Sequence, residues 1–408
     1  MATAIMAEAT KPERLWSGDY LIVMAASAGI SFCNYFFFST LPIYAQKLSG
    51  SMSYAGLITG VYTLAAMLVR PLAGSLSDRF GRTRLLILGA FVCSVACGLY
   101  DFARGLILLV VVRMINGAGF GVHSTCAGAV AADIIPPSRM AEGLGYFGLY
   151  GTIAAAVAPG IALSIIGEGT PARFEVLFIL AAAVSFASMA ADCCITYERG
   201  RGGPPVRKPL AAEDGNLPKT WMGFEYAVFP PAAVVILMHA ALSSVTAFLT
   251  LFVAERHLGN VGLFFTFNAA GLFLSRVLCG KIVDRRGANV VVIPSIAVLS
   301  ACFAAVPFAR SLAFLYLLSV PLGLAQGAAI PAIYALMFSR CSPARRGTAS
   351  AAFSSSIDIG YGVGAILFGL LAEGFGCDAV YFAAAAVSLA ALALYVLRLA
   401  GEVRRGSS

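Results

Sequence analysis

The chain alternates between long apolar runs and short polar breaks over almost its whole length. A helix needs about 20 residues to cross a hydrocarbon core about 30 Å thick. We therefore cut the chain where charges and turn residues cluster, and each remaining apolar run is predicted to be a membrane-spanning helix. Twelve segments result: 19–41, 54–76, 84–103, 105–132, 142–166, 176–196, 226–252, 260–279, 289–309, 312–338, 348–371 and 379–398.

The composition supports this interpretation. Of the 408 residues, 60% are apolar and 12% are charged, and the mean hydropathy is +0.86. A soluble domain of average make-up is roughly 25% charged, so this chain could not cover a water-facing surface. The sequence predicts an all-α membrane protein, for which the lipid bilayer is the main partner and nucleic acid is not one.

The basic residues fall mostly on one side of the predicted spans. The termini and the loops after the second, fourth, sixth, eighth and tenth spans hold 20 of the 28 Lys and Arg, and the opposite loops hold five. Lys and Arg concentrate on the cytoplasmic side of membrane proteins. Both termini are therefore predicted to lie in the cytoplasm, with the chain spanning the cell's inner (plasma) membrane many times.

The longest polar stretch separates six spans from six. It contains RGRGGPPVRKP and is typical of a flexible linker. This predicts five regions: a cytoplasmic N-terminus (1–18), a six-helix bundle (19–196), a cytoplasmic linker (197–225), a second six-helix bundle (226–398) and a cytoplasmic tail (399–408).

The two halves share a repeated sequence. VRPLAGSLSDRFGR at 69–82 and SRVLCGKIVDRRGA at 275–288 agree at six positions, each pair 206 residues apart. The same offset relates Gly117 to Gly323 and Pro137 to Pro343. Because six spans is an even number, duplicated halves share one orientation in the membrane. A substrate site is expected between such halves, near the middle of the bilayer.

The first of these blocks resembles the signature loop between spans 2 and 3 of the major facilitator superfamily, and the resemblance covers essentially the whole chain. It implies the major facilitator fold, with 12 transmembrane helices in two six-helix halves. It also implies a cytoplasmic gate, in which Asp78 braces the start of span 11 and Arg82 pairs with Asp133. The gate residues are Gly74, Asp78, Arg79, Gly81, Arg82, Asp133, Gly280, Asp284 and Gly287.

Two glycines of this loop also have a direct physical interpretation. Gly74 and Gly81 suit close helix approach and a tight turn, respectively, since glycine lacks a Cβ. The second copy of the block has Ala288 where Arg82 stands. This replacement weakens any matching latch in the second half.

Two further segments are similar to signatures of the superfamily. RMINGAGFG at 113–121 resembles its Arg-x-x-x-Gly pattern, which is associated with proton coupling. Around Pro159 a segment resembles the antiporter signature, with most of the family's glycines replaced by alanine. The whole chain resembles the twelve-span bacterial efflux branch, of the drug–proton antiporter or arabinose-efflux-like kind.

Ionisable residues deep in the membrane are costly and usually face a cavity. Asp358 lies about ten residues into its span, about 15 Å deep at the helical rise, and we expect it and Arg113 to serve proton coupling. The alternative for Asp358 is a hydrogen bond between helices. Arg70 and Arg276 lie nearer the ends of their spans, where the side chains can reach water.

Several other residues inside the spans are candidates for a substrate cavity. The histidines could titrate near neutral pH, although single buried histidines are more often packing residues. They form no metal-ligand cluster, and no cofactor is expected. The candidate cavity residues are Asn34, Phe37, His123, Tyr150, Pro159, His239 and Tyr361.

We therefore expect a monomeric secondary transporter that exports a small organic or amphipathic molecule, driven by protons through alternating access. Within this class, the alternative is an exporter of a metallophore or sugar-like metabolite, with Arg113 holding a carboxylate. From another class, the alternative is a membrane sensor that no longer transports. An enzyme is not expected, because paired catalytic groups are absent and GEGTP at 167–171 lacks the lysine of a phosphate-binding loop.

Overall fold

The computed structural model describes residues 15–136, 140–167, 170–198, 220–221, 224–340 and 346–401. Inside these ranges it does not describe the side chains of 75, 78, 140–142, 144–145, 220–221, 224–225, 276–281, 284–286, 338–339 and 346–351. The expected linker at 197–225 lies mostly outside the described residues. Within it, two short strands, β1 (Thr220–Trp221) and β2 (Phe224–Glu225), pair antiparallel.

Almost all of the described chain is helical. The first group of helices is α1 (Gly18–Ser49), α2 (Met52–Phe80), α3 (Arg82–Leu99), α4 (Leu106–Ile134), α5 (Met140–Ile166) and α6 (Pro171–Asp192). The second group is α7 (Phe229–Glu255), α8 (Gly262–Arg286), α9 (Asn289–Ala305), α10 (Leu312–Ser339) and α11 (Arg346–Tyr395). Short 3₁₀ or π turns adjoin them at η1 (Tyr100–Phe102), η3 (Tyr226–Val228), η4 (Val306–Phe308) and η6 (Val396–Ala400).

Local sequence explains where several helices begin and end. The hydroxyl of Ser17 accepts a hydrogen bond from the backbone N–H of Tyr20 and caps α1. Gly50 ends that helix with φ of 70°, a left-handed conformation that suits glycine. Gly81 and Gly287 occupy equivalent places after α2 and α8 and both have positive φ, 98° and 80°. The expected tight turn at Gly81 is therefore present and occurs in both halves.

The last two predicted spans are joined into one long element. Helix α11 is interrupted at Gly376, whose φ of 80° and ψ of 173° are not helical. Glu373 contacts Ser51 and, after the break, Asp378 pairs with Arg256. Among the described residues, ten helical stretches are long and apolar enough to cross a membrane, and Gly262–Ser275 of α8 is a shorter apolar one. Since α11 contains two spans, the described helices match the twelve predicted segments.

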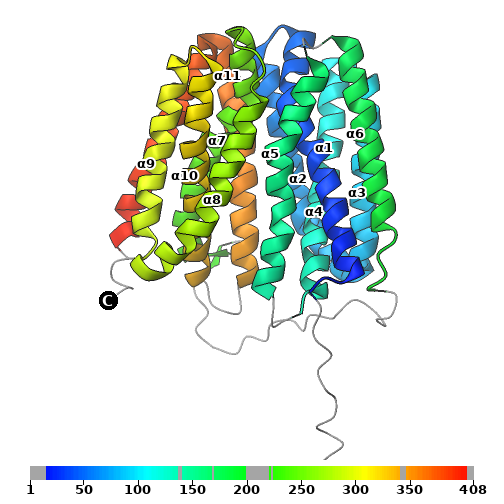
Figure 1. Cartoon of the computed structure of the whole chain (residues 1–408). Helices are drawn as coiled ribbons and strands as arrows, with labels where there is room; N and C mark the ends of the chain where they lie inside the picture. Colours follow the sequence, from blue (N-terminus) through cyan, green and yellow to red (C-terminus); the bar gives the residue numbers. More distant parts are fainter. Residues whose placement is uncertain are drawn as a thin grey trace, which may run out of the picture.

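The helices run side by side in two groups, α1–α6 and α7–α11 (Figure 1). Packing inside the groups repeats with the sequence. Gly117 of α4 lies against the backbone of Tyr62 in α2, and Gly323 of α10 lies against Asn268 in α8, each 206 residues later. A side chain at either glycine would collide with the neighbouring backbone. The repeat found in the sequence is therefore also a repeat of helix contacts.

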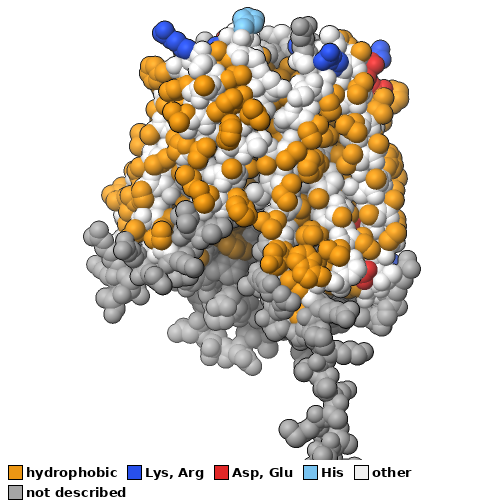
Figure 2. Space-filling model, viewed as in Figure 1, with side chains coloured by type: hydrophobic (Ala, Val, Ile, Leu, Met, Phe, Trp, Pro, Cys, Tyr) orange, Lys and Arg blue, Asp and Glu red, His pale blue; other side chains and the backbone are white. Residues whose placement is uncertain are grey.

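We name the two ends of the bundle by the chain itself. The termini end is where α1 begins and η6 ends, and the far end is where α1 and α7 end. Hydrophobic side chains cover the middle of the face shown in Figure 2, and several Lys and Arg side chains are visible at its far-end edge. Large apolar side chains such as Ile107 (84% exposed) and Leu317 (71%) point outward. This surface suits lipid rather than water.

Candidate functional site

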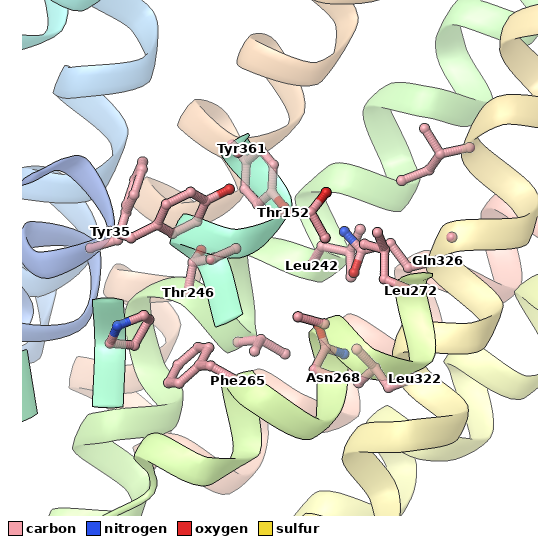
Figure 3. Close-up of a pocket in the computed structure, with 18 of the residues that line it drawn as sticks. Tyr35, Thr152, Leu242, Thr246, Phe265, Asn268, Leu272, Leu322, Gln326 and Tyr361 are labelled. Atoms are coloured by element: carbon pink, nitrogen blue, oxygen red, sulfur yellow. The ribbon is translucent and has the colours of Figure 1, made fainter. Parts of the chain in front are cut away.

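A cavity of about 350 Å³ lies between the two groups of helices. Its wall is built from α1 and α5 on one side and from α7, α8, α10 and α11 on the other (Figure 3). Its position between the halves is where the duplicated sequence predicts a substrate site. The lining residues are Tyr35, Phe38, Ser39, Gly148, Gly151, Thr152, Ala155, Pro159, Leu242, Val245, Thr246, Phe265, Asn268, Ala269, Leu272, Leu322, Gln326, Gly327, Ile330, Pro331 and Tyr361.

The described lining contains no Asp, Glu, Lys, Arg or His. Its polar groups are the amides of Asn268 and Gln326 and the hydroxyls of tyrosine, serine and threonine. Two of the residues expected in a cavity, Pro159 and Tyr361, are on this wall. Asn268 and Gln326 were not among our candidates, which included Asn34 as their single amide. The signal that could have found them is an amide placed within an apolar run.

The two halves contact each other between this cavity and the far end of the bundle. Thr266 of α8 donates a hydrogen bond of 2.7 Å to the carbonyl oxygen of Ala156 in α5. One turn further on, Gly262 lies against the Cα of Gly160. Beyond this contact a second hollow of about 740 Å³ is lined by Lys47, Ser164 and other far-end residues. The α5–α8 contact therefore separates the central cavity from the far end.

A second contact between the halves joins α2 to α11. Gly56 and Gly60 of α2 lie against the backbone or side chains of Ala365 and Ile366 in α11. Glycine lets two helix backbones approach closely, and this is a common way to pack helices in a membrane. At Gly56 the backbones of α2 and α11 consequently pack without an intervening side chain.

Asp358 is buried and pairs across this same interface. Its Oδ2 lies 2.7 Å from Nε of Arg70 in α2, and Arg70 also donates to the hydroxyl of Ser124 in α4 at 3.1 Å. Asp358 does not line the cavity, but it lies one helical turn from the lining residue Tyr361. Arg70, which we expected could reach water at the end of its span, instead neutralises the buried carboxylate.

Arg113 is fully buried inside the first half. Its guanidinium lies 4.0 Å from the ring centre of Tyr62 and 5.2 Å from that of Phe38. It also donates to Oδ1 of Asn116 at 3.2 Å. None of the ion pairs within the described part of the chain involves Arg113. Its charge is held by aromatic faces and an amide instead, behind the cavity residue Phe38.

His123 belongs to a buried pair that the sequence did not reveal. Its Nε2 lies 3.1 Å from Oδ2 of Asp192, and both side chains are almost completely buried. Asp192 is the last residue of α6. From the sequence we singled out Asp358 and not Asp192, which stands close to the end of its apolar run. The expectation that His123 lines the cavity is corrected, since its ring faces α6.

Four other cavity candidates also lie away from the cavity wall. Phe37 packs against Tyr100 within the first half, and Asn34 is buried in α1 with no hydrogen-bond partner for its Nδ2. Tyr150 stacks edge-on against Phe147. His239 bonds to the carbonyl of Val235 and lies edge-on behind Tyr361. Helix rotation decides which side of each helix meets the cavity, and the sequence alone did not fix that rotation.

The gate residues cluster at the termini end. Arg82 begins α3 and is buried, and its NH1 lies 2.6 Å from Oδ1 of Asp133 near the end of α4. The carboxylate of Glu198, after α6, accepts hydrogen bonds from the backbone N–H groups of Arg82 and Thr83. An acid at a helix N-terminus is favourable because it satisfies free N–H groups and the helix dipole.

Tyr197 completes this cluster. Its hydroxyl lies 3.1 Å from Oε1 of Glu198 and 3.5 Å from Oδ2 of Asp133. Burial, followed by the neighbouring carboxylates of Glu198 and Asp133, raises the pKa of Tyr197 above its ordinary value. The hydroxyl therefore stays protonated and available as a donor at neutral pH.

Other parts of the expected gate differ or are not described. Among the described atoms, none lies within 4 Å of the position that a Cβ would take at Gly74, so the described residues do not show the close helix approach expected there. Arg79 is exposed. The side chains of Asp78 and Asp284 and the surroundings of Gly280 lie outside the described residues. The contact between Asp78 and the start of span 11 therefore stays a prediction.

Comparison with known proteins agrees with this arrangement. The profile of the Major Facilitator Superfamily matches residues 23–309 and again 232–407. An MFS-type transporter of Methanocaldococcus jannaschii, MJ1560, is 26% identical over 371 residues, which cover 88% of this chain and 92% of that protein.

Two solved structures have a similar fold. The nucleoside transporter NupG matches with a TM-score of 0.77 at 15% identity, over 93% of this chain and 100% of that one. A bacterial homolog of the human lysosomal transporter Spinster, in an inward-facing and occupied conformation, matches with a TM-score of 0.75 at 18% identity, over 93% and 95%. The chain belongs to the major facilitator superfamily, a family of membrane transporters rather than enzymes.

Proposed function

We propose that this chain is a proton-coupled transporter that exports a small organic or amphipathic molecule by alternating access. The observation that carries the proposal is the Arg70–Asp358 ion pair of 2.7 Å. It joins α2 of one half to α11 of the other, one turn from the cavity residue Tyr361. A proton on Asp358 removes the charge that holds Arg70, so protonation acts on the contact between the halves.

Coupling follows from the cost of leaving a buried charge alone. Breaking a buried pair by neutralising one partner is strongly unfavourable for the remaining charge. Protonated Asp358 therefore favours an arrangement in which Arg70 reaches other partners or water. Because each arrangement opens the cavity to a different side, the proton and the substrate affect each other's binding. Arg113 adds a fixed positive charge in the first half, behind Phe38 on the cavity wall.

We place the termini end in the cytoplasm, with the chain in the cell's inner (plasma) membrane. The excess of Lys and Arg in the loops at that end supports this orientation. In the present arrangement the α5–α8 contact blocks the route from the cavity to the far end. The cavity then belongs to the inward-facing side of the cycle, the side from which an exporter loads its substrate.

The cluster of Arg82, Asp133, Tyr197 and Glu198 is proposed as the cytoplasmic gate. It ties the beginning of α3 to the ends of α4 and α6. This makes the termini end of the first half one rigid unit that can dock against the second half. Asp78 at the end of α2 would supply the docking contact.

The test uses purified protein in proteoliposomes with a pH-sensitive dye inside and an imposed pH gradient. A panel of uncharged, cationic and anionic small organic molecules is added to the outside. We expect at least one compound to cause proton movement with the wild-type chain. Asp358→Asn should abolish that movement, because the carboxamide cannot exchange a proton. Glu175→Gln, at an exposed acid 3.7 Å from Arg104, is the control and should behave as wild type.

Two results contradict the proposal. Proton movement that persists in Asp358→Asn rejects that residue as the coupling group. If none of the compounds causes proton movement with the wild-type chain, the result contradicts transport and favours the sensor alternative.

A further inference from the structure

The central cavity is polar without being charged, and this limits what it can hold. We propose that the transported molecule is uncharged and has a hydroxyl-rich end and a flat apolar end, as an aryl glycoside has. The hydroxyl-rich end contacts Asn268 and Gln326 of the second half. The inference rests on the proposed function in taking this cavity as the substrate site, and it adds the substrate class and the residues that select it.

The first argument concerns charge. Moving an ion out of water is costly unless an opposite charge meets it, and the described wall has none. The buried charges near the cavity are already engaged elsewhere. Asp358 is paired with Arg70, and Arg113 lies behind the rings of Phe38 and Tyr62. A charged substrate would therefore enter this cavity without a counter-charge.

The second argument concerns hydrogen bonds. Asn268 donates its Nδ2 to the carbonyl of Ser319 at 3.2 Å, which leaves its Oδ1 as an acceptor. The carboxamide of Gln326 and the hydroxyl of Tyr361 have no hydrogen-bond partner among the described residues. These groups offer both donors and acceptors to the cavity (Figure 3). Neutral hydroxyls match them, because a hydroxyl both donates and accepts.

The third argument comes from the duplication. The positions 206 residues before Asn268 and Gln326 are Tyr62 and Phe120. In the first half these two rings stack, with centroids 5.8 Å apart. The second half has replaced a closed aromatic pair with two amides whose polar atoms reach the cavity. The hydroxyl of Tyr62 is buried away from the cavity wall. Of these paired positions, only those of the second half therefore present polar groups to the cavity, and the polar end of the substrate is oriented towards that half.

The fourth argument concerns the apolar surface. Phe38 stands on the wall of the first half, and Phe265, Leu242 and Leu322 line the second. Aromatic faces such as Phe38 and Phe265 favour a flat apolar group through burial and ring contacts. A volume of about 350 Å³ lies within the range of pockets that hold small organic ligands, roughly 300 to 1,000 Å³. One ring and one sugar-sized group fit that space.

The test measures binding to the full chain in detergent, without any gradient, by ligand-dependent thermal stabilisation. Three probes share a nitrophenyl ring and a sugar: para-nitrophenyl β-D-glucopyranoside is neutral, the β-D-glucuronide is anionic, and the β-D-glucosaminide is cationic in slightly acidic buffer. We expect the neutral probe to stabilise the protein. The two charged probes should bind at least about tenfold more weakly, because nothing in the cavity offsets their charge.

Variants of the amides make the test specific. Gln326→Leu should weaken binding of the neutral probe about three- to tenfold, the range expected for losing one hydrogen bond. Gln326→Glu should raise the affinity for the cationic probe relative to that for the neutral one, because the carboxylate supplies the missing counter-charge. Gln46→Leu, the same change at the far end of α1 and outside the lining, should leave all three affinities unchanged. Unliganded melting temperatures show whether each variant is folded.

The proposal is overturned if the neutral glucoside fails to stabilise the wild-type chain. It is also overturned if a charged probe binds as well as the neutral one, or if Gln326→Leu has no effect. These failures are distinct from failure of proton coupling. Binding of the neutral probe without proton movement rejects proton coupling but not this substrate class. If charged compounds, and not neutral ones, are moved by the proton gradient, this substrate class is rejected and the transporter proposal stands.

Discussion

At the scale of single residues, the membrane interior makes every polar group conspicuous. Arg113, Asp358 and the pair His123–Asp192 are each buried, and each is accommodated in a different way. Arg113 lies against aromatic rings, Asp358 is paired across the two halves, and His123 is paired inside one half. Only the pair between the halves changes when the halves move, which separates a candidate coupling group from a structural one.

We therefore predict that the His123–Asp192 pair stabilises the fold and does not couple transport. His123→Leu leaves Asp192 buried without its partner and should lower the free energy of unfolding by about 3–5 kcal/mol. The double variant His123→Leu/Asp192→Leu should recover much of that loss, because no uncompensated charge remains. Thermal unfolding of the purified variants measures both effects. A double variant no more stable than the single one would show that the pair has another role.

At the scale of helices, glycine positions set how closely the halves approach. Gly56 of α2 lies directly against the backbone of Ala365 in α11, so this contact tolerates no side chain. Gly98 of α3 is also inside a helix, but no atom lies within 4 Å of its Cβ position. The two glycines look alike in the sequence and differ only in what packs against them.

Gly56→Val should hold the far ends of α2 and α11 apart and shift the protein towards a state open at that end. A cysteine introduced at Ser53, whose hydroxyl lies 3.3 Å from the carbonyl of Gly369, reports this opening. Its rate of labelling by a bulky maleimide in detergent, followed at that peptide by mass spectrometry, should rise several-fold. Gly98→Val is the matched control and should leave the rate unchanged. Equal labelling in both variants would argue against a moving α2–α11 contact.

At the scale of the whole molecule, alternating access requires the far-end contact to open in each cycle. Ser164 of α5 and Asn260, two residues before α8 begins, lie across this contact, with Oγ and Nδ2 3.3 Å apart. Both residues line the far-end hollow. A covalent link here should therefore trap the arrangement described above.

The double variant Ser164→Cys/Asn260→Cys should lose transport after mild oxidation and regain it after reduction. Binding of a ligand from the termini end should survive oxidation, since the cavity itself is not altered. Substrate-dependent proton movement in proteoliposomes and thermal stabilisation in detergent measure the two properties. Each single cysteine variant is the control for oxidation of native cysteines. Undiminished transport by the cross-linked protein would exclude rocking of the two halves at this contact.

The sequence by itself determined the number of spans, the duplication and which side of the predicted spans carries the basic loops. Each membrane helix forms the hydrogen bonds of its own backbone internally, so an apolar run of sufficient length is enough to define one. It also predicted the partners Arg82 and Asp133, through resemblance to a signature loop. Element boundaries differed by several residues, for example at Ser49, where polar far-end residues extend α1 beyond the apolar run.

Only the tertiary structure decided which side chains face each other. Arg70 meets Asp358 and His123 meets Asp192 across 288 and 69 residues of chain, and five of the seven expected cavity residues point into the packing between helices instead. The apolar pattern gives little information here, because lipid and protein neighbours are equally apolar and the helices are hydrophobic on all sides. The rotation of each helix, and with it the cavity wall, is set by close packing at glycines and by the few buried polar pairs.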